Sequence, residues 1–411
     1  MVNREVRGGE PLKNGQKKKW MRTRHRVVRN LLAAVLGPYC RLVYGIRIEK
    51  FRQQEDRPYL ILFNHQTAFD QFFVGLAFRG PIYYVASEDL FSKGWVSSLI
   101  RWLVAPIPIK KQANDVGAVM NCLRVAREGG TIAMAPEGNR TYSGKTATIN
   151  PAIAPLARKL GLPIAFYRIE GGYGVHPRWS DTVRKGKMRG YVSRVLMPEE
   201  IADLTNEQLC DVITQELAVD DTAAEGCYKS RRSAEYLERA MYVCPYCGLT
   251  VWKSHGDRIT CQTCQTQVKY LPTLALEGVD RPFPFRNTAE WYDYQCDFVN
   301  RLDTREYGKQ PFYRDTADLL EVIVYREKKR IQKQAPVALY GDRLEIGDRV
   351  FPFDELSAVT AVGRNKVNFY CGKQVFQLKG SPRFNGLKYV NLYYRHRHIQ
   401  RGEFDAKFLG L

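Results

Sequence analysis

The 411-residue sequence lacks a long hydrophobic run. Residues 1–19 contain no apolar stretch of the kind that a secretory signal carries. No run of about 18 uncharged apolar residues occurs in the chain, and the longest apolar stretch, residues 31–44, is interrupted by Pro38 and Arg41. The sequence therefore predicts neither a cleaved secretory leader nor a helix that spans a bilayer.

Acidic residues are scarce relative to basic ones. The chain has 43 Asp and Glu residues and 63 Lys and Arg residues, which gives a formal net charge of +20. Half of that positive excess lies in residues 1–60. With 45% apolar residues the chain can bury a core, so wholesale disorder is excluded. A basic surface needs an anionic partner, and nucleic acid, anionic lipid and a phosphorylated substrate all satisfy that requirement.

Disulfide spacing is also missing. Only four of the ten cysteines cluster, at residues 244, 247, 261 and 264. Scattered thiols in a chain of this length are typical of a reduced protein, so we expect a cytoplasmic location.

A basic, amphipathic segment opens the ordered part of the chain. Trp20 follows Lys17–Lys19, and the next helical stretch has Val27, Val28, Leu31 and Val35 on one face, with Arg22, Arg26 and Arg29 opposite. This pattern suits a helix that lies in the headgroup region of a membrane. A solvated arm followed by a helix packed on the domain fits equally well.

Short apolar runs alternate with helical stretches from residue 58 onward, which predicts an α/β domain with a mixed sheet flanked by helices. The expected strands are 59–64, 82–87, 104–109, 131–136 and 163–169, and a helix is expected at 115–128. In the acidic stretch 199–225, Thr205 and Gln208 predict a capping box at the start of another helix. In such domains the chemistry usually lies where strands end.

Two polar segments follow expected strands. In NHQTAFD (64–70), His65 and Asp70 lie five residues apart; an imidazole oriented by a carboxylate can take a proton from a hydroxyl. In APEGNRTYSG (135–144), Gly138 permits a tight turn beside Glu137 and Arg140, and an arginine fork suits a phosphate monoester.

Together these segments resemble the glycerolipid acyltransferase family, whose members carry an HX4D motif followed by PEGxR. The resemblance covers roughly residues 30–220. It implies that an acyl thioester, either acyl-CoA or acyl carrier protein, donates its acyl group to the hydroxyl of a lysophospholipid acceptor. By position, His65 is the base and Asp70 orients it, while Glu137, Gly138 and Arg140 hold the acceptor phosphate.

Two further family blocks occur in altered form. Between the main motifs, VAPIPIKK (104–111) has Lys110 or Lys111 where the family has an arginine, so lysine would supply the cation. The apolar block GLPIAFYRI (161–169) either shapes an acyl pocket or completes the sheet.

Cys244, Cys247, Cys261 and Cys264 form a C-x2-C-x13-C-x2-C pattern. Two such pairs predict a zinc ribbon with a structural, four-thiolate Zn²⁺ site; rubredoxin-type iron and free thiols are the alternatives. Beyond about residue 335, β-like runs precede a helical stretch near 385–396, similar in outline to small pleckstrin-homology-like domains.

These features predict six segments: a basic tail (1–19), an amphipathic membrane-associating region (20–57), an acyltransferase domain (58–235), a zinc ribbon (240–275), a linker or helical segment (276–334) and a β-rich accessory domain (335–411). The expected activity is acylation of lysophosphatidate to phosphatidate, by a peripheral protein on the cytoplasmic face of an anionic membrane. The alternatives are the same reaction on glycerol 3-phosphate or another lysolipid, and a non-catalytic lipid- or nucleic-acid-binding protein. Because the basic clusters flank the core rather than the ribbon, a lipid surface is favoured over nucleic acid.

Overall fold

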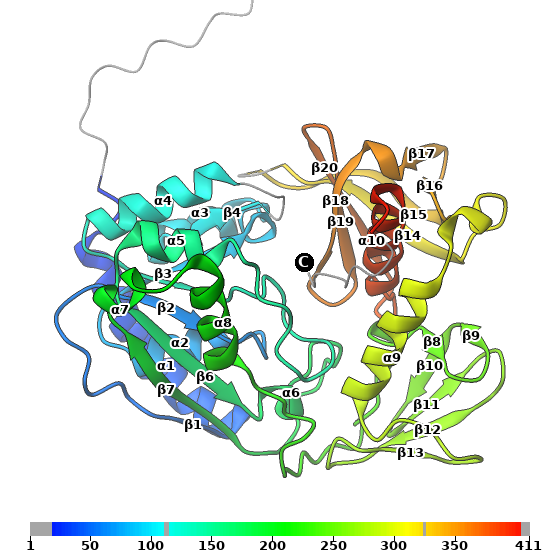
Figure 1. Ribbon diagram of the computed structural model, residues 1–411, viewed down its shortest axis with the longest axis horizontal. Helices are drawn as coiled ribbons and strands as arrows, with labels where there is room; N and C mark the ends of the chain where they lie inside the picture. The colour runs from blue at the N-terminus through cyan, green and yellow to red at the C-terminus, as the bar shows by residue number, and fades with distance from the viewer. Residues whose placement is uncertain (1–18, 111–114, 324–325, 404–411) are drawn as a thin grey trace, which may run out of the picture.

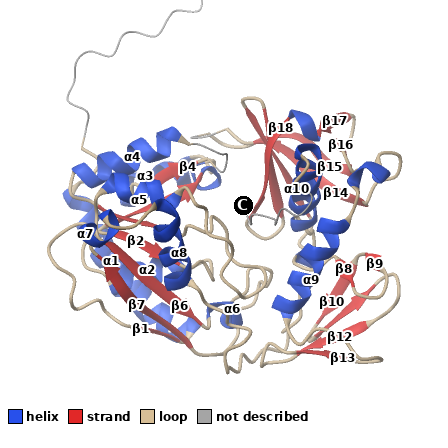
Figure 2. Cartoon of the chain, in the orientation of Figure 1, coloured by secondary structure: helices blue, strands red, loops and turns tan. Residues whose placement is uncertain are grey.

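The computed structural model describes residues 19–110, 115–323 and 326–403. In Figure 1 a sheet with helices on both faces forms the N-terminal part, and a curled sheet with helix α10 forms the C-terminal part. Small strands and helix α9 lie between them in the sequence, and Figure 2 shows how strand-rich the second half of the chain is.

The N-terminal sheet has seven strands in the order β1-β7-β6-β2-β5-β3-β4. All neighbouring pairs are parallel except β6 and β7. The mixed α/β class predicted from the sequence is therefore confirmed. The strands are β1 (Ile46–Ile48), β2 (Leu60–Phe63), β3 (Ile82–Ser87), β4 (Ile107–Ile109), β5 (Thr131–Met134), β6 (Ile164–Glu170) and β7 (Met188–Leu196).

Helices cover both faces of this sheet, as the central strand β2 illustrates. Ile61 and Phe63 pack in the core that contains Phe73 of α2, whereas Leu60 and Leu62 pack in a second core with residues of α4 and α5. Strands buried on both faces read as continuous apolar runs. The helices of this part are α1 (Thr23–Tyr44), α2 (Asp70–Ala77), α3 (Trp95–Val104), α4 (Val116–Arg127), α5 (Ile153–Leu160), α6 (Gly172–Val175), α7 (Pro198–Ala202) and α8 (Asn206–Leu217).

Local sequence signals located most of these elements. The helix expected at 115–128 is α4, and the Thr205–Gln208 capping box begins α8. The strand expected at 104–109 is wrong in its first half: α3 runs to Val104, and Ala105 ends it in a left-handed conformation at φ 42°. The apolar residues before Val104 recur at helical spacing, and Pro106 prevents the helix from continuing.

Helix α1 packs against the domain through a face that mixes polar and apolar side chains. His25, Cys40 and Tyr44 are buried, and Arg29 donates to the carbonyl oxygens of Gly75 and Phe78. The apolar face points outward instead, with Val27, Leu31, Val35 and Leu42 exposed. None of the described helices is long and apolar enough to cross a membrane.

The middle segment holds a two-stranded and a four-stranded sheet. The second has the order β10-β11-β12-β13, and helix α9 follows it. Trp252 of β10 and Trp291 of α9 are buried against each other with ring centroids 4.9 Å apart. The elements are β8 (Val243–Cys244), β9 (Gly248–Leu249), β10 (Trp252–His255), β11 (Arg258–Cys261), β12 (Gln267–Tyr270), β13 (Leu276–Gly278) and α9 (Thr288–Arg301).

The C-terminal sheet is antiparallel throughout, in the order β17-β16-β15-β14-β20-β19-β18, and α10 (Leu387–Arg401) packs against it. This agrees with the expected β-like runs followed by a helix; likeness to a pleckstrin-homology domain stays a prediction. Strand β14 lies within 276–334, so the sheet extends beyond the range expected for it. The strands are β14 (Tyr313–Glu321), β15 (Lys329–Leu339), β16 (Arg343–Ile346), β17 (Arg349–Pro352), β18 (Leu356–Val362), β19 (Lys366–Cys371) and β20 (Gln374–Gly380).

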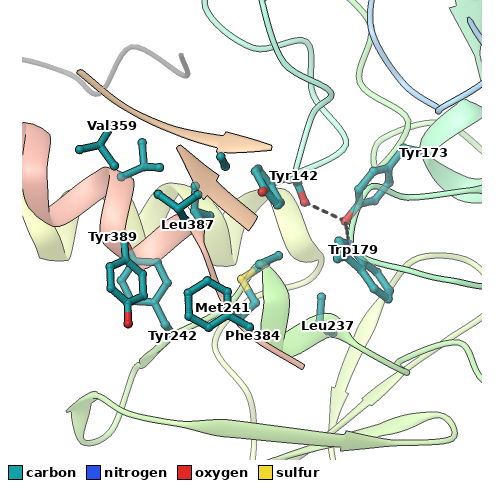
Figure 3. Close-up of a cluster of buried hydrophobic side chains, with 14 of the residues drawn as sticks. Tyr142, Tyr173, Trp179, Leu237, Met241, Tyr242, Val359, Phe384, Leu387 and Tyr389 are labelled. Atoms are coloured by element: carbon teal, nitrogen blue, oxygen red, sulfur yellow. Dashed lines mark hydrogen bonds between the residues drawn. The ribbon is translucent and has the colours of Figure 1, made fainter. Parts of the chain in front are cut away.

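A buried cluster joins the parts of the chain. Figure 3 shows Tyr142 and Trp179 of the N-terminal part in the same cluster as Val359 and Leu387 of the C-terminal part. The hydroxyl of Tyr173 accepts a hydrogen bond from Trp179 Nε1 at 3.1 Å and donates to the carbonyl of Tyr142 at 3.2 Å. The C-terminal sheet is therefore packed against the loops that follow β5 and β6.

Candidate active site

The end of β2 places His65 at the edge of the central sheet. Asn64 leaves the strand, and its side-chain amide exchanges two hydrogen bonds with the backbone of Ile169 in the neighbouring strand β6, at 2.8 and 2.7 Å. This pairing holds the start of the loop. The chain then turns through Gln66 and Thr67 and enters α2 at Asp70, the first residue of the helix.

Asp70 is fully buried and accepts hydrogen bonds from four groups. The donors are the backbone N–H groups of Gln66 and Thr67, the Thr67 hydroxyl, and Nδ1 of His65, at distances of 2.7 to 2.9 Å. An ionised carboxylate is an acceptor only, so this donor set matches the charged form. The carboxylate is thus held rigidly against the imidazole.

This arrangement defines the tautomer of His65. Because Nδ1 faces a carboxylate, it carries the proton, and Nε2 is left as the acceptor. Burial lowers the pKa of His65 below its ordinary value, and the hydrogen bond and charge of Asp70 oppose that effect. The neutral imidazole, with Nε2 free to take a proton, is the form present near pH 7.

The loop after β5 meets the loop after β2. Glu137 is only 1% exposed; its Oε1 accepts from the backbone N–H of His65 at 2.6 Å, and its Oε2 accepts from that of Ala147 at 2.7 Å. The N–H of Thr141 donates to the carbonyl of His65 at 3.0 Å. Burial raises the pKa of Glu137, and its two N–H donors oppose that shift; because both oxygens accept from N–H groups, the contacts fit the ionised carboxylate. Glu137 therefore fixes the backbone of His65 through a hydrogen bond.

Gly138 and Arg140 form the turn beyond Glu137. Gly138 has φ 69°, a left-handed conformation that favours glycine. Among the described residues, Arg140 Nη1 is a buried nitrogen without a hydrogen-bond partner. Burial lowers the pKa of Arg140 to about 10, with further lowering by Arg178 and Arg364, so the guanidinium stays positively charged at neutral pH. A buried, unpaired donor beside His65 is suited to an anionic ligand.

The altered family blocks have different positions. Lys110 follows β4, the edge strand, and its backbone N–H donates to Asp115; Lys111 lies outside the described residues. The apolar block at 161–169 largely coincides with β6, which pairs with β2 and β7. Two roles were expected for this block, shaping an acyl pocket or completing the sheet, and the strand pairing supports the second.

Sequence reasoning missed three residues close to this centre. The hydroxyl oxygen of Tyr44, at the end of α1, lies 3.3 Å from Nδ1 of His176. Arg178 is 2% exposed, and its Nη1 donates to the carbonyl of Arg140 at 3.1 Å. In the sequence it opens a stretch, residues 178–194, with six basic side chains and one acidic one, and such a stretch does not distinguish a buried arginine from a solvated one.

The four clustered cysteines come together in the middle segment. Their sulfur atoms all lie within 4.8 Å of one another, with Cys244–Cys264 and Cys247–Cys261 at 3.6 and 3.5 Å. Zn–S bonds of about 2.3 Å give tetrahedral S···S edges of about 3.8 Å, so the donor set fits zinc. Arg281 Nη2 lies 3.2 Å from the sulfur of Cys264, and the hydroxyls of Thr266 and Thr250 lie 3.0 and 3.3 Å from Cys264 and Cys261. Against the opposing effect of burial, hydrogen bonds with Thr266 lower the pKa of the Cys264 thiol to about 6, which favours its thiolate form.

The fold and the site define a mixed α/β protein with a histidine–aspartate pair at a strand end and, in the neighbouring loop, a half-buried arginine whose Nη1 is buried. Residues 45–169 match the family model described as Acyltransferase. The 1-acyl-sn-glycerol-3-phosphate acyltransferase BAT2, chloroplastic, of Brassica napus is 22% identical over 166 residues, 40% of this chain and 46% of that protein. The chain thus spans about half the length of this curated relative.

Among solved structures, the 1-acyl-sn-glycerophosphate (LPA) acyltransferase PlsC from Thermotoga maritima is similar. It is 22% identical, the match covers 48% of this chain and 80% of that one, and the TM-score is 0.39.

Proposed function

We propose that the protein transfers a fatty acyl group from a thioester donor, acyl-CoA or acyl carrier protein, to the free hydroxyl of lysophosphatidate, giving phosphatidate. The observation that carries this proposal is the His65–Asp70 pair, with Nδ1 bound to a four-donor carboxylate and Nε2 available. The match to the Acyltransferase family model supports acyl transfer, and the name of the Brassica relative supports this acceptor.

In the proposed mechanism His65 Nε2 takes the proton of the acceptor hydroxyl as its oxygen attacks the thioester carbonyl. A new C–O ester bond forms, the C–S bond breaks, and the proton passes from the imidazolium to the leaving thiolate. Asp70 stabilises the imidazolium that forms. General-base catalysis of this kind typically accelerates a reaction by about 10²–10⁴-fold. Glu137 fixes the backbone of His65, and Arg140 binds the acceptor phosphate.

The acceptor is a lipid, and the exposed apolar faces of α1 and α3 support access from a membrane surface. Leu42 of α1 is 83% exposed, and Trp95 and Trp102 of α3 are 73% and 54% exposed. Arg24 joins the two helices: its Nε donates to the carbonyl of Trp102 at 2.9 Å. Arg41 of α1 and Arg101 of α3 are exposed on the same two helices. Exposed apolar and aromatic groups accompanied by cations suit an anionic bilayer, on which we propose that the protein is peripheral.

We further propose that the four cysteines hold a structural Zn²⁺. All four ligands would be protein thiolates, so the ion would stabilise the fold of the middle segment rather than take part in acyl transfer.

The test is a labelled acyl-CoA, and separately a labelled acyl carrier protein, incubated with lysophosphatidate, glycerol 3-phosphate and a choline lysolipid. We expect phosphatidate as the main product, and none above background from folded His65→Ala. Product from His65→Ala at the wild-type rate would overturn the mechanism. Faster acylation of glycerol 3-phosphate or of the choline lysolipid would make that compound the acceptor in place of lysophosphatidate. No product with either donor, together with tight binding to duplex nucleic acid, would favour a nucleic-acid-binding role.

A further inference from the structure

The hairpin formed by β18 and β19 reaches the N-terminal part of the chain beside Arg140. Arg178 connects them: its Nη2 donates to the carbonyl of Ala361 at 3.1 Å, its Nε to that of Gly363 at 3.3 Å, and its Nη1 to that of Arg140 at 3.1 Å. One buried guanidinium thus holds the tip of a C-terminal hairpin and the backbone of the proposed phosphate-binding residue. The same guanidinium lies over the ring of Tyr142, a residue of the cluster in Figure 3, at 4.2 Å from the ring centroid.

Arg364 projects from the tip of this hairpin toward the same site. Its Nη1 lies 2.8 Å from Asp181 Oδ1 and its Nη2 lies 3.0 Å from Nε2 of His176. Burial lowers the pKa of His176 to about 4, and the charge of Arg364 contributes. The imidazole is therefore neutral, so Nε2 accepts from Arg364 and Nδ1 donates to the hydroxyl of Tyr44.

Positive charge exceeds negative charge around this point. Arg140, Arg178 and Arg364 converge here, and Arg364 is near enough to Arg140 to lower the pKa of that guanidinium. The carboxylate of Asp181 is shared, because Arg239 Nη1 also contacts it at 2.7 Å. Asp70 is already bound to His65. The buried Arg140 Nη1 lacks a partner among the described residues, so the cluster has an unmet requirement for an anion.

We propose that Arg364, supplied by the C-terminal sheet, completes the binding site for a phosphate monoester together with Arg140, and that it makes the site selective for phosphate-bearing acceptors. This inference rests on the proposed function for the identity of the acceptor. A guanidinium has five N–H donors, of which Asp181 and His176 use two, so donors remain for phosphate oxygens. The side chain is 33% exposed, which leaves it open to a ligand.

The test is equilibrium binding without acyl donor, so that it is independent of turnover. Lysophosphatidate, glycerol 3-phosphate and a phosphate-free monoacylglycerol are titrated into the full chain and into Arg364→Ala, Arg364→Lys and the control Arg349→Ala. Arg349 is exposed on β17, at the opposite edge of the same sheet from β18.

We expect Arg364→Ala to bind lysophosphatidate and glycerol 3-phosphate about 10- to 100-fold more weakly, as the loss of a charge-assisted pair predicts, and to bind monoacylglycerol as the wild type does. Arg364→Lys should recover part of the affinity, because lysine meets phosphate as a point charge. Arg349→Ala should match the wild type. Equal weakening for monoacylglycerol, or unchanged affinity for both phosphate ligands, overturns the inference; the melting temperature of each variant identifies any loss of fold.

Kinetics distinguish this inference from the proposed function. If the wild type transfers acyl groups, Arg364→Ala should raise the acceptor KM with little change in kcat, and an unchanged KM overturns the role of Arg364 alone. If the wild type binds phosphate ligands through Arg364 but forms no acylated product with either donor, the proposed function fails and the binding site stands.

Discussion

Oε1 of Glu137 accepts a hydrogen bond from the backbone N–H of His65 at 2.6 Å, across 72 residues of sequence. This contact joins the two motif segments, and it gives Glu137 a partner in the backbone of His65. The phosphate-binding role that the family resemblance implied for Glu137 stays a prediction, and a positioning role is the alternative that these contacts favour. The partner of the carboxylate is the protein's own backbone, and both of its oxygens are used in this way.

Glu137→Gln should therefore lower kcat more than it raises the acceptor KM. The amide keeps one oxygen acceptor but turns an NH2 group toward the other backbone N–H, which leaves that donor unsatisfied. A cost of about 1–3 kcal/mol in the free energy of unfolding is expected from such a loss. Denaturant unfolding and steady-state kinetics measure the two effects, with Glu225→Gln, an exposed carboxylate, as the control. A large rise in the acceptor KM with unchanged kcat would instead support a role of Glu137 in binding the acceptor.

The pH dependence of kcat/KM should report His65. The neutral imidazole is the base, so activity is present above the pKa of His65 and is lost as the pH falls through it. Since burial lowers this pKa below 6.5, the acid limb should have its midpoint below that value. A midpoint above 6.5 would contradict the environment described for His65.

Asp70→Asn should reduce kcat by about 10²-fold or more, because an amide neither stabilises the imidazolium nor holds its tautomer. The substitution also leaves part of the four-donor set without an acceptor, so the melting temperature should fall as well. Asp211→Asn, at an exposed position of α8, is the matched control. Wild-type turnover by a folded Asp70→Asn protein would remove Asp70 from the mechanism.

The sequence predicted those features that depend on neighbouring residues. His65 and Asp70 could be located because an apolar strand precedes them and a helix follows, and the cysteines because each pair is a local turn. Arg178 and Arg364 could not be identified, since each acquires its environment from a contact across more than 180 residues. Periodicity also does not identify which face of α1 is buried. That face is held by polar contacts with α2 and β3: Arg29 donates to the carbonyl of Gly75, and Nδ1 of His25 lies 3.1 Å from the hydroxyl of Tyr83.

Protein purified without chelator should contain close to one zinc per chain, and Cys247→Ser should lower this ratio. Because metal binding contributes directly to folding free energy, the variant should also melt at least about 5 °C lower. Cys227→Ser, which changes an exposed thiol outside the cluster, should alter neither value. Metal analysis by mass spectrometry and a thermal melt provide the measurements; substoichiometric zinc in the wild type, or iron in its place, would contradict the assignment.

Replacing Trp95 and Trp102 together by alanine should weaken binding to anionic phospholipid vesicles by at least about tenfold, because each indole buries a large apolar surface when it enters the interface. The apolar contribution acts alongside the charge of the exposed arginines on α1 and α3, so raising the salt concentration should weaken wild-type binding further. Val350→Ala, at a 56% exposed apolar position on β17, is the control. Vesicle co-sedimentation measures the partition coefficient, and acyl transfer to a short-chain, water-soluble lysophosphatidate measures the active site separately. The double variant should keep acyl transfer to the water-soluble lysophosphatidate while it loses vesicle binding. Equal vesicle binding by wild type and variant would show that this face does not contact the membrane.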